Sequence, residues 1–123
     1  MRHYPHRRLD IAVTEPDPGG PVLVMLAGEL DGEEVAPLQD VIAGVVHRCG
    51  TTPVQVDAAG LTFLDSSGIR ALLRCRRVCH QAGSRFAMPA VSENVFQVLE
   101  ITGLLDILEV GTVARQVRVP PVV

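Results

Sequence analysis

Aromatic side chains are scarce in this sequence. Its 123 residues include no Trp, one Tyr and three Phe. Proteins bind single-stranded nucleic acids by stacking the bases on aromatic rings, so this composition argues against such a partner. The formal net charge of −3 also argues against a broad basic face for duplex DNA. We therefore expect no nucleic-acid partner.

Segments that would direct the chain to or through a membrane are lacking as well. The longest apolar run, residues 22–27, has six residues, whereas a helix that spans a bilayer needs about 20. No apolar stretch follows the basic residues at the start of the chain, as it would in a secretory signal. The three cysteines cannot all pair within one chain, which indicates reduced thiols. We expect a cytoplasmic protein with no membrane partner.

The rest of the composition is typical of a folded domain. Hydrophobic residues make up 47% of the chain and charged residues 20%, which argues against a disordered chain. The length suits one domain that builds its own core without disulfides. We expect an N-terminal tail at residues 1–8, loosely held, and a single folded domain at residues 9–119.

Hydrophobic periodicity predicts strands that alternate with helices. Apolar side chains at every second position of residues 9–13 indicate a half-buried strand. The continuous apolar run at residues 22–27 indicates a second strand, buried on both faces, that forms a hairpin with the first. A loop is expected at residues 59–63. The remaining predicted strands lie at residues 53–58, 85–88 and 107–110.

Three helices are predicted between these strands, because apolar residues recur there at helical spacing. Each begins at a polar residue and ends at a glycine. The predicted starts are Asp31 (with Glu34 in a capping-box arrangement), Ser67 and Ser92, and the predicted ends are Gly50, Gly83 and Gly103. With a short helix after Thr112, the order is ββαβαβαβ plus a short C-terminal helix. This order predicts an α/β fold with a mixed, mostly parallel sheet packed by helices.

The segment Asp65-Ser66-Ser67-Gly68 joins a predicted strand to a predicted helix. Asp31 also follows a strand, and the ends of parallel strands share one rim of a sheet. A phosphate on a serine there would meet unpaired N–H groups and the positive end of the helix dipole. It would add roughly −1.5 to −2 charges and oppose binding of an apolar or acidic partner. Taken alone, however, the tetrapeptide is better explained as an ordinary helix cap with a glycine for tight packing.

Three segments resemble those of a known family. Residues 54–73 (VQVDAAGLTFLDSSGIRALL) closely resemble the signature of STAS domains, in particular of bacterial anti-sigma-factor antagonists. Residues 28–31 (GELD) look like the upstream motif of that family, and residues 95–104 (VFQVLEITGL) are similar to its third-helix segment. The resemblance covers about residues 9–112. This context favours a functional junction over an ordinary cap.

The resemblance implies a partner-switching mechanism. The unphosphorylated antagonist binds an anti-sigma factor that is also a serine kinase, and thereby frees a sigma factor. The kinase phosphorylates the serine directly after the aspartate of the motif, which here is Ser66, and a serine phosphatase restores it; Ser67 is the second choice. The implied partner-binding residues are Asp31, Asp65, Ser66, Ser67, Gly68 and Ile69. The two aspartates would position the loop or meet the kinase, and since ATP belongs to the kinase, we expect no cofactor and no small-molecule substrate.

Two other interpretations are weaker. A STAS domain can instead serve as a subunit of another signalling or lipid-transport complex without a sigma-factor role, but a phosphorylatable residue at Ser66 favours the switch. An enzyme with Ser66 as its nucleophile would need a base, and the sequence has neither a Gly-x-Ser-x-Gly elbow nor an evident histidine partner. We expect no catalytic activity.

Two clusters on the second predicted helix invite functional interpretation. Cys75 and Cys79 lie four residues apart, but one helix turn supplies too few ligands for a metal site, so small core residues are the better explanation. Arg70, Arg74 and Arg77 share a helical face, for which a solvated surface is the default interpretation. If this face binds anything, an acidic partner surface is expected.

Overall fold

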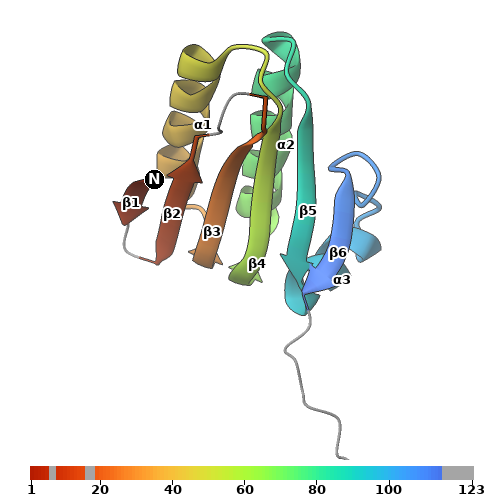
Figure 1. Cartoon of the computed structure of the whole chain (residues 1–123). Helices are drawn as coiled ribbons and strands as arrows, with labels where there is room; N and C mark the ends of the chain where they lie inside the picture. Colours follow the sequence, from red (N-terminus) through yellow and green to blue (C-terminus); the bar gives the residue numbers. More distant parts are fainter. Residues whose placement is uncertain (6–7, 16–18, 115–123) are drawn as a thin grey trace, which may run out of the picture.

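A mixed β-sheet with its helices on one face forms the molecule (Figure 1). The computed structural model describes residues 1–5, 8–15 and 19–114, and within them six strands pair in sequence order. Neighbouring strands are antiparallel up to β3 and parallel from β3 onward. The strands are β1 (Arg2–Pro5), β2 (Leu9–Thr14), β3 (Val22–Leu30), β4 (Val54–Leu64), β5 (Phe86–Ser92) and β6 (Val110–Ala114). The predicted α/β fold with a mixed, mostly parallel sheet is confirmed.

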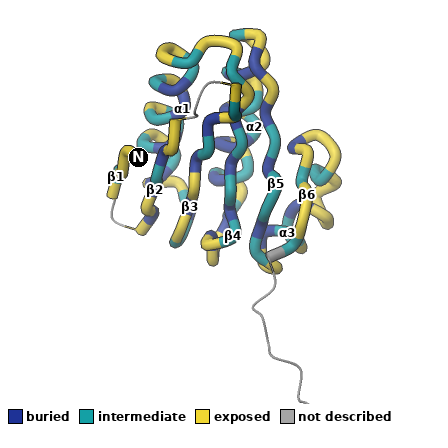
Figure 2. Tube along the Cα trace, in the orientation of Figure 1, coloured by how far each residue is buried: buried dark blue, intermediate teal, exposed yellow. Residues whose placement is uncertain are grey.

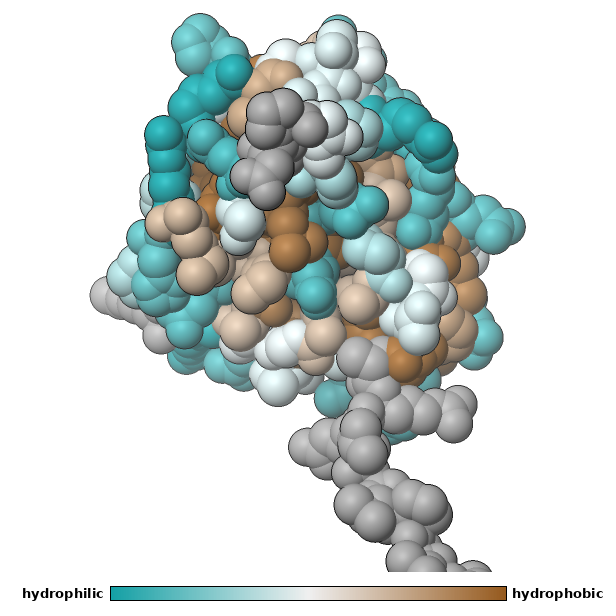
Figure 3. All heavy atoms as spheres, viewed as in Figure 1, coloured by the Kyte–Doolittle hydropathy of each residue, from teal (hydrophilic) through white to brown (hydrophobic). Residues whose placement is uncertain are grey.

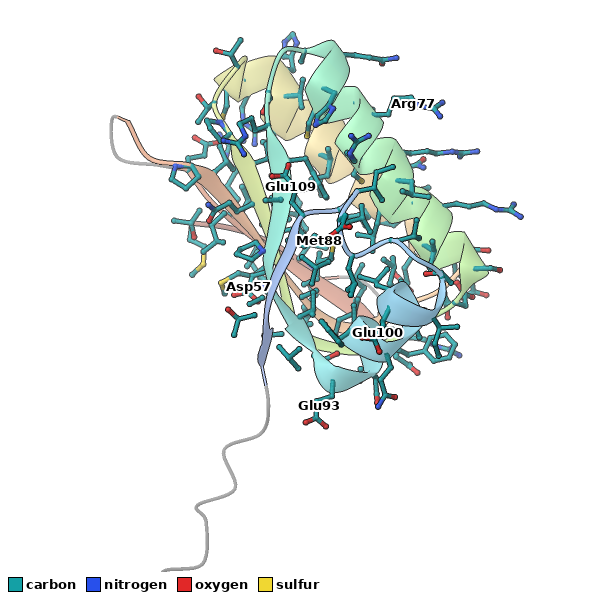
Figure 4. The ribbon with its side chains drawn as sticks, turned by 90° about the vertical axis from the view of Figure 1, so that its right-hand side faces the viewer. Asp57, Arg77, Met88, Glu93, Glu100 and Glu109 are labelled. Carbon is teal, nitrogen blue, oxygen red and sulfur yellow. The ribbon has the colours of Figure 1, made fainter. Side chains whose placement is uncertain are left out.

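Three helices connect the parallel strands of the described chain: α1 (Val35–Cys49), α2 (Ser66–Gln81) and α3 (Glu93–Ile101). Figure 4 views the sheet from its edge and shows them on one side of it. Their predicted apolar stripes face the core, with Leu38 and Ile42 of α1 and Leu72 of α2 fully buried. Ser92 caps α3 as predicted, because its Oγ accepts a hydrogen bond from the Val95 N–H at 3.3 Å.

The opposite face of the sheet carries no helix of the described residues. Along β3, Val22, Val24 and Leu26 are buried, whereas Met25 is 40% exposed, and Figure 2 shows this alternation along the central strands. Figure 3 looks onto this face, where apolar and small residues lie among polar ones. The prediction that the second strand of the hairpin is buried on both faces is therefore wrong. A run of apolar residues does not show whether two layers of helices exist to cover them.

Strands β4 and β5 extend well beyond their predicted ends. The segment at residues 59–63, predicted as a loop, belongs to β4, because its backbone pairs with β3 as far as Leu30↔Leu64. β5 continues through Pro89 to Ser92. Proline has no N–H to donate, but the register between β4 and β5 shifts beside it, and such a bulge accommodates the missing hydrogen bond.

Both ends of the described chain differ from the prediction. Arg2–Pro5, expected to be a loose tail, forms β1 and pairs antiparallel with β2. The last strand lies at Val110–Ala114 rather than at residues 107–110, because turns occupy the chain up to Glu109, which has a positive φ of 49°. The start of the short helix predicted after Thr112 is thus part of β6. The rest of that helix, and the predicted domain end at residue 119, lie outside the described residues.

Candidate partner-binding and modification site

β3 and β4 end side by side at one edge of the sheet. Their last paired residues are Leu30 and Leu64, and Asp31 and Asp65 follow directly. The prediction that both aspartates lie on one rim is confirmed. Parallel pairing brings the two loops together although 34 residues separate them in the sequence.

Hydrogen bonds from both sides hold the last part of β4 in place. Thr62 Oγ1 donates to the Gly28 carbonyl at 3.0 Å. On the other side, Ser92 Oγ donates to the Leu61 carbonyl at 2.5 Å and Asn94 Nδ2 donates to the Thr62 carbonyl at 3.2 Å. The start of α2 is therefore fixed to β3 and to the first turn of α3.

Asp65 is the residue that caps α2. Its Oδ1 accepts a hydrogen bond from the Gly68 N–H at 2.8 Å, and its carbonyl accepts one from the Ile69 N–H at 2.9 Å. The helix begins at Ser66, one residue earlier than predicted. Because a carboxylate already serves as the cap, neither serine hydroxyl is needed for that task.

The two serines have different surroundings. Ser66 is exposed, whereas Ser67 is half-buried and its Oγ faces the loop after β3, 3.6 Å from the position that a Cβ on Gly32 would occupy. Within the described part of the chain, neither hydroxyl makes a hydrogen bond. Ser66 is therefore the more accessible of the two hydroxyls.

Gly68 allows α2 to pack directly on the ends of the two strands. It is buried, and a Cβ added to it would lie 2.6 Å from the Leu30 carbonyl oxygen and 2.7 Å from Leu64 Cδ1. Ile69, also expected in the partner-binding set, is half-buried and packs against the core. Gly68 and Ile69 therefore position α2 against the sheet and offer little surface to a partner.

Asp31 does not cap α1, which corrects the capping-box prediction. The helix begins at Val35, and its N-cap position is Glu34, without a side-chain cap bond. Asp31 instead accepts hydrogen bonds from the Glu33 N–H at 3.0 Å and from Arg8 Nη1 at 3.2 Å. The chain makes a turn at residues 31–34 before the helix starts, so the carboxylate fixes this turn and ties it to the residue before β2.

A polar hollow of about 190 Å³ opens next to Ser67. It lies between α2 and the turn that leads into α1. Its lining residues are Gly32, Val35, Ser67, Arg70, Ala71 and Arg74. Arg70, Arg74 and Arg77 are exposed, as the interpretation of a solvated face predicted, but that interpretation did not reveal the hollow beside them. The four-residue spacing of Arg70 and Arg74 showed that they share a helical face. It did not show that the turn before α1 lies opposite that face.

Phe63 is a second feature of the rim that the sequence analysis did not single out. It pairs with Glu29 in the parallel register and is 45% exposed. An exposed aromatic ring two residues before the cap of α2 is a surface that a protein partner can bury. Regular alternation would place Phe63 on the same face as the buried Leu61, so the local residues did not indicate its exposure; the register between β3 and β4 shifts just before Phe63.

The cysteines form no site of their own. Cys49, Cys75 and Cys79 are all free, and the described residues contain no group of three or more potential metal ligands. Burial raises the pKa of the Cys75 thiol to about 12 and that of Cys79 to about 11. These thiols stay protonated at neutral pH, consistent with small core residues. No helix of the described chain has the length and apolar composition needed to cross a membrane.

Comparisons with known proteins agree with this geometry. Residues 13–109 match the family model described as "Mlab, STAS domain". The anti-sigma-B factor antagonist of Staphylococcus epidermidis is 30% identical over 88 residues, which cover 72% of this chain and 81% of the relative. The protein of the same name from Staphylococcus aureus (strain NCTC 8325 / PS 47) is 28% identical over the same coverage.

Two solved structures share the fold. The anti-sigma factor antagonist SpoIIAA in its unphosphorylated form has a TM-score of 0.67 and 24% identity, over 83% of this chain and 88% of that one. An anti-sigma factor antagonist from Mycobacterium paratuberculosis has a TM-score of 0.68 and 20% identity, over 84% and 85%. The family match spans most of the described domain and includes both strand ends of the rim. The chain belongs to the STAS domain family.

Proposed function

We propose that this protein is an anti-sigma-factor antagonist controlled by phosphorylation of Ser66. In its unphosphorylated state it binds an anti-sigma factor that is also a serine kinase, and a sigma factor is released. The names of its relatives support the antagonist role. The proposed setting is the cytoplasm, with a serine phosphatase as the second partner and with ATP as a substrate of the kinase alone.

The state of the Ser66 hydroxyl is the observation that carries this proposal. Ser66 is the first residue of α2, it is exposed, and Asp65 already caps the helix. A hydroxyl that the fold does not use can be modified without loss of structure. A phosphate at the first turn is favourable to the helix by about 0.3–1 kcal/mol, so modification changes the surface and leaves the fold intact.

The proposed effect of the phosphate is electrostatic. It adds roughly −1.5 to −2 charges at neutral pH next to Asp65 and on the rim shared with Asp31. A partner that contacts this rim must then desolvate the phosphate or face repulsion. Phosphorylation thereby switches off the binding that the unphosphorylated form makes.

Catalysis by Ser66 has no geometric support. A nucleophilic serine is activated by a base within hydrogen-bond reach. Among the described residues neither Ser66 nor Ser67 has a hydrogen-bond partner, a histidine included. We propose a binding protein and not an enzyme.

Phosphorylation is tested by incubating the protein with candidate anti-sigma kinases and ATP, followed by mass spectrometry. We expect one phosphate on the wild type and on Ser67→Ala, the matched control, and none on Ser66→Ala. Labelling of Ser66→Ala at the wild-type level would reject the assignment to Ser66.

Binding to the anti-sigma factor is tested by calorimetry with Ser66→Asp and Ser66→Ala. We expect Ser66→Asp to weaken binding and Ser66→Ala to preserve it. Equal affinity of the two variants would reject the switch. If the wild type binds no anti-sigma factor at all, the alternative role as a subunit of another signalling or lipid-transport complex is favoured.

A further inference from the structure

A groove between α1 and α2 begins beside Ser67 and continues toward the far end of both helices. It consists of the hollow of about 190 Å³ described above and a second one of about 370 Å³, and Arg74 lines both. The second hollow is more apolar, with Ile42, Ala43 and Val78 among its lining residues. The groove therefore has a polar end near the proposed switch and an apolar end away from it.

Positive charge predominates among the side chains that line this groove. Arg70, Arg74 and Arg77 line it at i, i+4 and i+7, and Arg77 points away from the sheet (Figure 4). Within the described chain none of the three forms an ion pair. Asp40 is the one carboxylate among the lining residues that the structure describes. Three positive charges thus face one negative charge, in a chain whose net charge is −3.

One further donor lines the larger hollow. The Nε2 atom of Gln39 is buried without a hydrogen-bond partner among the described residues. Leaving a buried donor unpaired is costly. Because this atom is shielded from solvent, a carboxylate in the groove would reach it only after the Gln39 side chain turns outward, whereas the exposed Arg74 guanidinium is directly available.

We propose that the groove binds an acidic amphipathic helix of a protein partner. Its carboxylates would lie against Arg70 and Arg74, and its apolar side chains over Ala43 and Val78, which are at least partly exposed. A helix fits better than an extended strand, because the groove is formed by two helices whose backbone groups are already paired. From Ser67 to Val78 the groove is about 16 Å long at 1.5 Å per residue, or roughly three helical turns.

Charge complementarity with such a partner also explains the direction of the proposed switch. Ser66 and Arg70 are four residues apart on α2, so a phosphate on Ser66 can reach the Arg70 guanidinium. It would take this cation from the partner and repel the partner's carboxylates at the mouth of the groove. The naming of the partner as the anti-sigma factor rests on the proposed function, whereas the acidic helix rests on the groove itself.

The test uses a synthetic helical peptide with glutamates along one edge and leucines along the next. A control peptide carries lysines in place of the glutamates. Both peptides are titrated at low salt into the full-length protein, isotope-labelled for NMR. Binding is monitored by the chemical shifts of the backbone amides. We expect saturable shifts at Gly32, Gln39, Ala43 and Val78 with the acidic peptide only, and weaker binding at high salt, where charges are screened.

Two charge-reversal variants distinguish specific binding in the groove from general electrostatic attraction between the protein and the acidic peptide. We expect Arg74→Glu to lower the affinity for the acidic peptide about tenfold or more, since Arg74 lines both hollows. Arg85→Glu is the matched control, because Arg85 directly precedes β5 and its side chain is 81% exposed and paired with Glu109. Shifts spread over other surfaces, or equal losses in the two variants, would overturn the proposal.

The same variants distinguish the failure of this proposal from failure of the proposed function. The peptide titration judges the groove without any sigma-factor protein present. If Arg74→Glu retains full affinity for both the peptide and the anti-sigma factor, the groove is not a binding site, even where Ser66→Asp abolishes the complex. If the peptide binds as expected but the wild type has no affinity for an anti-sigma factor, the groove stands and the sigma-factor role is rejected.

Discussion

Replacing Gly68 with alanine is expected to destabilise the protein, although alanine is the better helix former. The added methyl group would lie 2.6 Å from the Leu30 carbonyl oxygen, 2.7 Å from Leu64 Cδ1 and 3.0 Å from Leu30 Cγ. Carbon atoms pack best at about 3.5–4.0 Å, so α2 must move away from the ends of β3 and β4. Overpacking of this kind costs about 1–3 kcal/mol, against a gain of up to about 1 kcal/mol in helix propensity. We expect a net loss of about 1–2 kcal/mol.

Gly44→Ala in α1 is the matched control, because its added methyl group meets one flexible side chain. The nearest atom within 4 Å is Arg48 Nη1, at 3.1 Å. Here the propensity gain dominates, and we expect stabilisation by about 0.5–1 kcal/mol.

Urea denaturation with a shared m-value measures both changes, and calorimetry should show Tm shifts of opposite sign, about 4 °C per kcal/mol for a chain of this length. A Gly68→Ala protein as stable as the wild type would refute the packing argument. Destabilisation of both variants to the same extent would refute the contrast between the two sites.

Four further predictions concern the cap of α2, the buried thiols and a surface ion pair. Asp65→Ala should lower the unfolding free energy by about 1 kcal/mol, and Asp65→Asn by less, in chemical denaturation, because the amide oxygen can still cap α2. At pH 8 a thiol reagent should label Cys49 first, while Cys75 and Cys79 react only on unfolding. Their folded pKa values, raised from 9.0 to about 12 and about 11, mean that the folded state keeps protons that the unfolded chain releases. The unfolding free energy should therefore fall as the pH rises above 9, and a Cys75→Ala/Cys79→Ala variant should lose this dependence. Arg8→Ala removes a surface ion pair with Asp31 and should change the unfolding free energy by less than about 1 kcal/mol.

The helices were predictable because helix formation depends on neighbours a few residues apart. The apolar spacing of α1 correctly indicated that Leu38, Ile42 and Val45 face the core. Likewise Ser92 caps α3, because its hydroxyl accepts a hydrogen bond from the N–H of Val95, only three residues away. A cap within Asp65-Ser66-Ser67-Gly68 was also readable, since a capping side chain and the N–H that donates to it lie within one turn, but the local residues did not show that Asp65 supplies the acceptor.

The ends of the strands were decided by partners distant in the sequence. Residues 59–63 are extended because β3 pairs with them and because Ser92 and Asn94 donate to their carbonyls. Pro89 is tolerated in β5 only because the register with β4 shifts next to it. Neither effect can be read from the local residues, which alone favour a loop and a strand end.

The sequence by itself determined the α/β order, the family resemblance and the serine pair at the start of α2. Only the tertiary structure decided that Asp65 is the cap, so that Ser66 is exposed and free, while Ser67 faces the loop after β3. It also decided that the solvated face of Arg70 and Arg74 lies beside a groove. A helical pattern shows which side chains share a face. What lies opposite that face depends on how the parallel strands bring α1 and the turn at residues 31–34 against α2.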